Sequence, residues 1–357
     1  MHISIYTLGC KTNYCDGEAM AALFASAGHT VALKLEVAEV YIINTCSVTS
    51  YSDHKSRQAI AKAKKLNPNA RIYVAGCSVE ADKTQFQKDD IIAICGTSGK
   101  QEFAERIIKD LATTSQSIVT QEQIIPIPTT FENPKSIYKG RKRGFVKIQD
   151  GCNNFCAYCI VPYLRGRSRS RSVDSIIAEA QKKAQTATEI VITGININDY
   201  GKDFEPQINL TRLIEKLKDV DAQKRISSIS PRIITKDFLD ICVSSNVVPA
   251  FHIALQSGSD KILKAMGRQY TVKEFVSAVT LIRSHYASPI ITADIICGFP
   301  TETEDDHIAT VNLLKELKLD DVHIFPFSVR AGTKAEKMDG KVEDKTITRR
   351  AKEMRLV

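Results

Sequence analysis

Short apolar runs alternate with longer amphipathic segments along the first third of the chain. The β-rich runs read HISIYTLG, VYIINT and RIYVAG, and patterns of helical period follow at residues 16–27, 52–66 and 79–87. Strands that alternate with helices predict a parallel sheet with right-handed crossovers. A cysteine lies just past each strand, at Cys10, Cys46 and Cys77. Because the carboxyl ends of parallel strands share one edge of a sheet, these three thiols can converge in space.

A second series of strand and helix patterns begins near residue 145. Its predicted strands span residues 145–149, 189–193, 225–229, 251–255, 290–297 and 322–327, with helical patterns between them. Six βα units make an incomplete form of the closed barrel, whose chemistry lies at the carboxyl ends of the strands. The expected fold class is therefore α/β. An open parallel-sheet βα domain is expected at residues 1–118, a proline-containing linker at 119–138, and an incomplete (β/α)6 barrel at 139–357.

Composition narrows the class of protein. Of the 357 residues 43% are hydrophobic and 25% are charged, which is ordinary for a globular protein. The chain has no apolar run long enough for a membrane helix, and MHISIYTLGC lacks the basic start of a secretory signal. We therefore expect a cytoplasmic protein without a membrane partner. In a reducing compartment its ten cysteines favour metal or redox chemistry over disulfides.

The net charge of +8 is concentrated in one segment. Residues 139–171 contain nine basic side chains and Asp150 as the single acid. Such a segment predicts contact with a polyanion or an anionic cofactor, although a solvated charged face is the alternative. The predicted RNA contacts are Lys139, Arg141, Lys142, Arg143, Arg165 and Arg167.

Cys152-x3-Cys156-x2-Cys159 follows the first strand of the second series. Three thiolates in one loop can hold a metal or an iron–sulfur cluster. A tetrahedral zinc site needs a fourth ligand, and the next cysteine is as distant as Cys242. A four-iron cluster on three thiolates keeps one iron free to bind something else. A zinc ion completed by a distant ligand is the alternative.

This loop, with Tyr158 before its last cysteine, resembles the cluster motif of radical S-adenosylmethionine enzymes. The stretch DGCNNFCAYCIVPYLRGRSRSR is similar to their methylthiotransferase branch, as are LGCKTN, NTCSVTSYSDHKSRQ, VAGC, EIVITGININDYG, HIALQSGSDKILKAMGRQYT and DIICGFPTETEDD. The resemblance implies a transferase with two [4Fe–4S] clusters. Cys152, Cys156 and Cys159 would hold the catalytic cluster that cleaves S-adenosylmethionine. The triad of Cys10, Cys46 and Cys77 would hold a second cluster, which carries the sulfur.

The resemblance also implies a cofactor pocket, partners and a substrate. The expected S-adenosylmethionine contacts are Tyr158, Arg171, Gly194, Gln256 and Gly298. LGCKTN and DHKSRQ are most similar to enzymes that methylthiolate C2 of N6-threonylcarbamoyladenosine at tRNA position 37. Enzymes for isopentenyladenosine in tRNA or for a ribosomal-protein aspartate are the alternatives within the family. A non-catalytic RNA-binding iron–sulfur or zinc protein is the alternative outside it.

The expected partners are the tRNA anticodon arm, an electron donor such as a flavodoxin or ferredoxin, and an unidentified sulfur donor, with the protein itself a monomer. Family members usually continue into a small C-terminal β-barrel RNA-binding module of the TRAM type, and the sequence given ends before it, at Val357.

The remaining cysteines are expected to pack in the core; these are Cys15, Cys95, Cys242 and Cys297.

Overall fold

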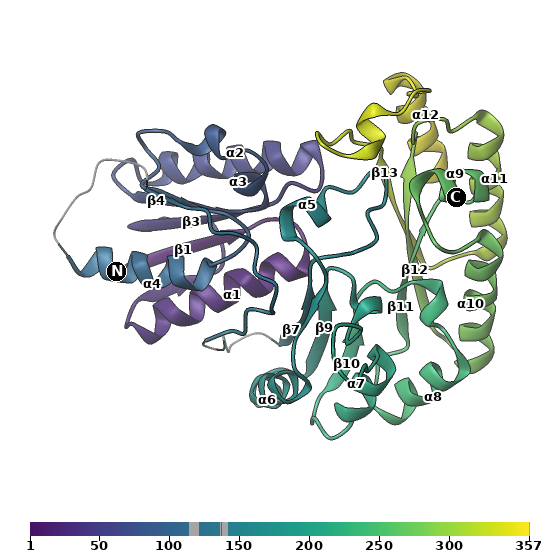
Figure 1. Cartoon of the computed structure of the whole chain (residues 1–357), viewed down its shortest axis with the longest axis horizontal. Coiled ribbons are helices and arrows are strands. Elements are labelled where there is room, and N and C mark those ends of the chain that lie inside the picture. The colour runs from purple at the N-terminus through teal and green to yellow at the C-terminus, as the bar shows by residue number, and fades with distance from the viewer. Residues whose placement is uncertain (114–120, 136, 138–141, 357) are drawn as a thin grey trace.

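The N-terminal part of the chain forms a six-stranded parallel sheet in the order β2-β1-β3-β4-β5-β6 (Figure 1). The computed structural model describes residues 1–113, 121–135, 137 and 142–356. The strands are β1 (His2–Thr7), β2 (Thr30–Ala32), β3 (Val40–Thr45), β4 (Arg71–Gly76), β5 (Ala93–Cys95) and β6 (Gln121–Gln123). The helices are α1 (Lys11–Ser26), α2 (Ser50–Leu66), α3 (Cys77–Ala81) and α4 (Lys100–Ala112).

The expected parallel sheet is confirmed, and it is wider than the sequence pattern predicts. β1, β3 and β4 are the three predicted strands, whereas β2, β5 and β6 were not predicted. β6 lies within residues 119–138, so the predicted linker is wrong at its start: this segment extends the sheet by pairing with β5. Residues 119–120, 136 and 138 of that linker lie outside the described residues.

Helices cover both faces of this sheet, which explains why every residue of β3 is buried. On one face Met20 and Phe24 of α1 join Phe103 of α4 in a common cluster with the strands. On the other face Ala63 of α2 and Val79 of α3 pack against the alternate strand residues. The carboxyl ends of β1, β3 and β4 therefore share one edge, as the crossover rule requires.

The second part is the incomplete barrel. Its strands are β7 (Arg143–Asp150), β8 (Arg169–Ser170), β9 (Glu189–Gly194), β10 (Gln223–Ile226), β11 (Ala250–Gln256), β12 (Ile290–Cys297) and β13 (Asp321–Pro326). Its helices are α5 (Val161–Arg165), α6 (Val173–Ala184), α7 (Leu210–Lys216), α8 (Lys236–Ser244), α9 (Asp260–Met266), α10 (Val272–His285), α11 (Glu304–Leu317) and α12 (Asp344–Met354).

All six predicted barrel strands are present, and they form two parallel groups. β7, β9 and β10 pair side by side, as do β11, β12 and β13. The groups meet where Ile229, after β10, forms a parallel bridge with Ile253 of β11. β10 ends at Ile226, earlier than predicted, and the short β8 adds an unpredicted antiparallel pair to β7.

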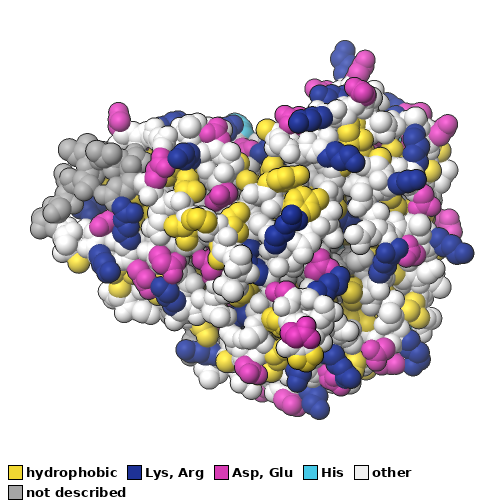
Figure 2. All heavy atoms as spheres, viewed as in Figure 1, with side chains coloured by type: hydrophobic (Ala, Val, Ile, Leu, Met, Phe, Trp, Pro, Cys, Tyr) yellow, Lys and Arg dark blue, Asp and Glu magenta, His cyan; other side chains and the backbone are white. Residues whose placement is uncertain are grey.

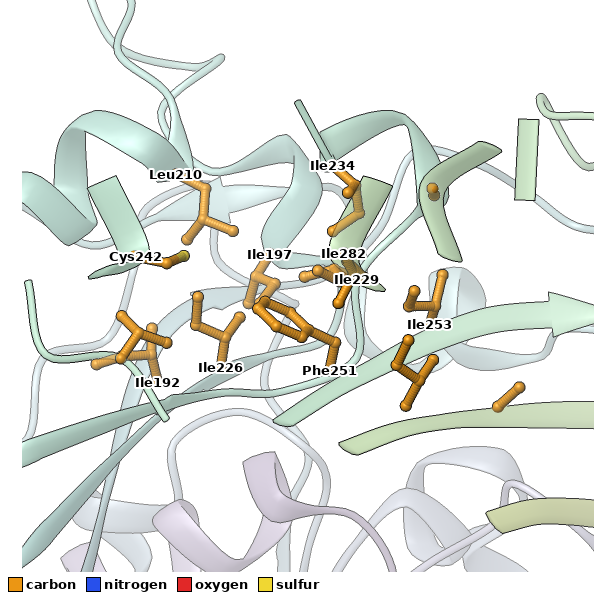
Figure 3. Packing of buried hydrophobic residues seen from close by; sticks show 14 of the residues in the cluster. Ile192, Ile197, Leu210, Ile226, Ile229, Ile234, Cys242, Phe251, Ile253 and Ile282 are labelled. Carbon is orange, nitrogen blue, oxygen red and sulfur yellow. The ribbon is translucent and has the colours of Figure 1, made fainter. Parts of the chain in front are cut away.

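The barrel core lies between the strands and the outer helices (Figure 3). Ile192, Ile226 and Ile253 point outward from the strands and pack with residues such as Leu210 of α7 and Ile282 of α10. Because side chains alternate along a strand, the residues beside them face the barrel interior.

Among the described helices, none combines the length and the apolar composition needed to cross a bilayer.

Candidate functional site

The first cysteine triad lies at the sheet edge formed by β1, β3 and β4. Cys10 directly precedes α1, Cys46 follows β3, and Cys77 is the first residue of α3. Burial raises the pKa of Cys46 to about 11, and the neighbouring thiols of Cys77 and Cys10 raise it as well. The structure therefore brings the three predicted thiols together.

Two glycines allow the loops of this triad to approach one another. Gly9 has φ +90°, and a Cβ there would lie 2.4 Å from the Cys46 Sγ. Gly76 has φ +106°, and a Cβ there would lie 2.6 Å from the Thr45 carbonyl oxygen. The Ser78 hydroxyl donates to the Cys46 carbonyl at 2.8 Å and so ties two of the loops together. Neither glycine can be replaced without separating the loops.

The second triad lies in the loop between β7 and α5. The loop turns at Gly151, with φ +70°, where a Cβ would lie 1.9 Å from the Arg167 carbonyl oxygen. Burial raises the pKa of Cys159 to about 12, and the thiols of Cys156 and Cys152 raise it further. Arg268 donates to the Cys156 Sγ at 3.4 Å. Three thiols in one enclosed loop are thus placed beside a guanidinium.

Helix α5 connects the two triads. It begins two residues after Cys159, and Ile160 and Leu164 pack directly against Cys77. α5 also packs on α3, which Cys77 begins. The barrel loop and the sheet edge therefore face each other across this short helix (Figure 1).

A buried ion-pair network joins the two domains beneath α5. Asp16 of α1 lies 3.0 Å from the Lys100 Nζ, 2.6 Å from the Lys147 Nζ and 3.0 Å from the Arg165 Nη2. Arg165 also pairs with Asp150 at 3.1 Å. Burial alone would raise the pKa of Asp16, but the three cations hold it below its ordinary value. Burial raises the pKa of Cys10, and Arg165 opposes that shift, so the network acts electrostatically on the first triad.

The comparisons with known proteins agree with this arrangement. Residues 146–314 match the radical SAM superfamily, and residues 2–96 match the "Uncharacterized protein family UPF0004". The threonylcarbamoyladenosine tRNA methylthiotransferase MtaB of Bacillus subtilis is 35% identical over 348 residues, which cover 96% of this chain and 77% of that protein. The chain belongs to the radical S-adenosylmethionine tRNA methylthiotransferases. It is therefore a transferase that uses S-adenosylmethionine and [4Fe–4S] clusters.

Other relatives of this methylthiotransferase differ in their stated substrate. The tRNA-2-methylthio-N(6)-dimethylallyladenosine synthase of Moorella thermoacetica is 36% identical and covers 95% of this chain and 78% of that protein. Among solved structures, the radical S-adenosylmethionine methyltransferase TsrM of Kitasatospora setae aligns with a TM-score of 0.59 at 13% identity. That alignment covers 91% of this chain and 74% of TsrM. It confirms the two-domain α/β fold and carries nothing about substrate.

Both cysteine triads of the methylthiotransferase fit the cluster chemistry of its family. Each offers three thiols, none of them in a disulfide. The thiolate is the form that binds iron, so cluster binding would displace the protons of these thiols. Each triad leaves one position of a four-iron cluster without a cysteine ligand.

The residues predicted to bind S-adenosylmethionine have different environments. Tyr158 packs on Phe299 and lies near Arg268, beside the second triad. Gln256 ends β11 with φ +71°, a strained conformation typical of functional positions. Their contacts with the cofactor stay predictions.

The structure gives packing roles to both predicted glycines. A Cβ at Gly194 would lie 2.9 Å from the Gln149 carbonyl oxygen, and one at Gly298 would lie 2.4 Å from Ile347 of α12. The amide of Gly298 already donates to Glu302 at 3.1 Å. Close contact with the protein itself thus explains both glycines, and a cofactor contact at either stays a prediction.

The cofactor contact predicted for Arg171 stays a prediction, and the structure gives this residue a role in the protein's own packing. Its guanidinium is buried and pairs with Glu179, and it also donates to Ser175 at 3.0 Å and to Asn133 at 3.2 Å. Arg171 and Glu179 line a cavity together with Cys15 and Lys183 at the domain interface. Arg171 therefore stabilises that interface.

The basic segment does not form a continuous surface patch. Arg165 is 2% exposed and its terminal nitrogens donate to Asp150, Asp16 and Asn13 inside the protein, so its predicted contact with RNA is wrong. Lys142, Arg143 and Arg167 are exposed. Lys139 and Arg141 lie outside the described residues. Basic and acidic side chains are intermixed over the face shown in Figure 2.

Sequence reasoning missed two residues that shape the cluster loop. The buried Gln149 side chain donates to the Gly151 carbonyl at 2.6 Å and accepts from the Asn196 amide at 2.8 Å. Arg268 follows the end of α9, far from the cluster loop in the sequence, and its guanidinium donates to the Cys156 Sγ. Gln149 is the last residue but one of β7, just before the loop, which was the available signal, whereas no local pattern marks Arg268. The other four cysteines are not beside either triad: Cys95, Cys242 and Cys297 are in the cores, and Cys15 is in the interface cavity.

Replacing Asp16 by Asn is expected to lower the free energy of unfolding by about 3–5 kcal/mol, because three cations lose a buried carboxylate. Since the folded-state pKa of Asp16 is lowered, this stabilisation is present above the ordinary aspartate pKa of about 4 and is lost as the pH falls below it. Urea unfolding followed by circular dichroism measures the change. Asp240→Asn, in the exposed pair with Lys236, is the matched control and should have almost no effect. Equal effects of the two variants would contradict a stabilising network.

Proposed function

We propose that this enzyme inserts a methylthio group at C2 of N6-threonylcarbamoyladenosine at tRNA position 37. The observation that carries the proposal is the two cysteine triads that face each other across α5. The substrate is supported by Lys11 and by Lys55-Ser56-Arg57, which resemble the threonylcarbamoyladenosine branch. Overall identity does not separate the branches, because relatives named for the two nucleosides are 35% and 36% identical.

Cys152, Cys156 and Cys159 would hold the cluster that supplies the electron for cleaving S-adenosylmethionine, and Cys10, Cys46 and Cys77 the cluster that supplies the sulfur. The remaining work belongs to the chain. Arg268 orients Cys156 and Tyr158 together. The Ile160, Leu164 and Cys77 packing excludes water between the triads. The network around Arg165 fixes the distance between the domains that carry them.

The tRNA anticodon arm is the proposed partner, and it would dock beside the cluster loop. Arg167 lies over the Phe155 ring at 4.4 Å, and the exposed Tyr163 packs edge-on against Phe155. Exposed aromatic and arginine side chains together are the usual platform for unpaired bases. Lys142 and Arg143 would add phosphate contacts. A flavodoxin-like or ferredoxin-like electron donor, a monomeric state and a cytoplasmic location complete the proposal.

Mass spectrometry of tRNA nucleosides from a strain without the gene tests the substrate. We expect 2-methylthio-N6-threonylcarbamoyladenosine to disappear and its unmethylthiolated form to accumulate. A plasmid copy of the gene should restore the modification, and a copy with Cys156→Ala should not. Loss of the methylthiolated isopentenyladenosine instead would place the enzyme in the other branch.

A further inference from the structure

Three neighbouring strands of the barrel each carry one side chain of a type that binds transition metals. The residues are His252 on β11, Asp294 on β12 and His323 on β13, and these strands pair side by side (Figure 1). Phe251 and Ile253, which flank His252, pack in the outer core (Figure 3). Because side chains alternate along a strand, His252 faces the barrel interior, and the same alternation places Asp294 and His323 there.

The carboxylate of Asp294 lies between the two imidazoles. Its Oδ2 is 3.0 Å from the His252 Nε2, and its Oδ1 is 3.1 Å from the His323 Nδ1. One ligand atom of each residue lies within 4.8 Å of the other two. Ligand atoms on a tetrahedral zinc ion, with bonds of about 2.0–2.1 Å, are about 3.3 Å apart. One ion can therefore contact all three side chains after small side-chain movements.

Each imidazole also has a partner on its other ring nitrogen. The Thr292 hydroxyl lies 2.8 Å from the His252 Nδ1, and the Asp321 carboxylate lies 3.4 Å from the His323 Nε2. Such outer partners are usual for histidines that bind metals, because they fix the orientation of the ring and the nitrogen that is free to bind. Asp294 and Asp321 together balance the charge of a divalent cation.

The cations on the other strands do not take these carboxylates. Arg143 and Arg225 both pair with Glu189 on β9, in the other group of strands. Lys11 also interacts electrostatically with Asp294, but it is exposed, so water and salt screen its charge. The described partners of Asp294 are therefore the two imidazoles, whose nitrogens are themselves metal ligands.

A second cluster with metal-binding residue types shows the contrast. Glu304, His307 and Glu353 also lie close together. Arg349 pairs with both of these glutamates, and Arg350 pairs with Glu304 as well. Two guanidiniums already neutralise these acids, so this cluster is not suited to a cation.

We propose that His252, Asp294 and His323 form a site for one divalent transition-metal ion of the zinc type, separate from both cysteine triads. Two imidazoles and a carboxylate are a set of ligands that zinc takes in proteins, and three protein ligands leave a position for water or an anionic group. His323 is half-exposed, which gives the ion a path from solvent. The site does not depend on which nucleoside the enzyme modifies.

Zinc binding to the enzyme with both clusters reconstituted tests this inference. One equivalent of Zn²⁺ is added, unbound metal is removed by gel filtration, and elemental analysis counts zinc separately from the cluster iron. The wild type should retain about one zinc per chain. In competition with a zinc-binding dye, His252→Phe and His323→Gln should weaken zinc affinity about a hundredfold or more, and Asp321→Asn about tenfold to a hundredfold. Glu304→Gln, in the second cluster, is the matched control and should keep the full affinity.

X-ray absorption at the zinc edge identifies the ligands. The wild type should show nitrogen and oxygen at about 2.0–2.1 Å with the outer scattering of imidazole, whereas sulfur at about 2.3 Å would place the zinc at a cysteine triad. Thermal unfolding shows whether each variant is folded, and the half-exposed position of His323 makes His323→Gln the mildest change. No retained zinc in the wild type, a sulfur shell, or undiminished affinity in folded His323→Gln would overturn the inference.

Discussion

Replacing Cys152, Cys156 and Cys159 together by alanine is expected to abolish the formation of 5′-deoxyadenosine and to remove about half of the bound iron. The wild-type protein should hold about eight irons, because two four-iron clusters are expected. The three thiols lie in one enclosed loop, so their removal leaves no ligand for the barrel cluster. Iron analysis and chromatography after anaerobic reconstitution measure the two quantities.

Cys242, which belongs to neither triad, provides the control. It is buried in the barrel core, away from both triads, and Cys242→Ala removes a thiol without removing a proposed ligand. This variant should keep its full iron content and its 5′-deoxyadenosine formation. Full iron content in the triple variant would instead show that the loop is not a cluster site.

Replacing Cys10, Cys46 and Cys77 together by alanine is expected to stop methylthiolation and to leave 5′-deoxyadenosine formation measurable. These thiols lie at the sheet edge of the other domain, and the barrel loop keeps its own cysteines and Arg268. The iron content should again fall to about half. Reverse-phase chromatography of the reaction and nucleoside mass spectrometry of the tRNA measure both products.

Removal of three buried thiols also creates cavities, so the fold must be checked separately. Circular dichroism and the unfolding midpoint should show a folded protein, since Cys77 packs only with Ile160 and Leu164 in its small apolar cluster. If a folded variant makes no 5′-deoxyadenosine, the two triads do not have separate roles. If it still methylthiolates tRNA, the first triad does not carry the sulfur.

The positions of both triads follow from sequence patterns that act locally. Three cysteines after three parallel strands must share an edge, and the structure has them there. The polar strand β6 shows the limit of that reasoning. Its sequence, Gln-Glu-Gln, has no strand propensity, and its place beside β5 depends on the neighbouring chain.

The basic segment shows a second limit. Charge counted along the sequence treats each arginine as if water surrounded it. Arg165 instead pairs with Asp16, which is 149 residues away in the other domain, and with Asp150. The pairing depends on how α1 docks against the barrel, which no local pattern specifies.

One anaerobic reaction tests the central claim most directly. It contains reconstituted enzyme, S-adenosylmethionine, dithionite and tRNA with N6-threonylcarbamoyladenosine, and mass spectrometry follows both the nucleoside and 5′-deoxyadenosine. We expect 2-methylthio-N6-threonylcarbamoyladenosine and 5′-deoxyadenosine to form together, and neither to form without dithionite or S-adenosylmethionine. Binding of the tRNA with no methylthiolated nucleoside and no 5′-deoxyadenosine would contradict the claim and would identify a non-catalytic RNA-binding iron–sulfur protein.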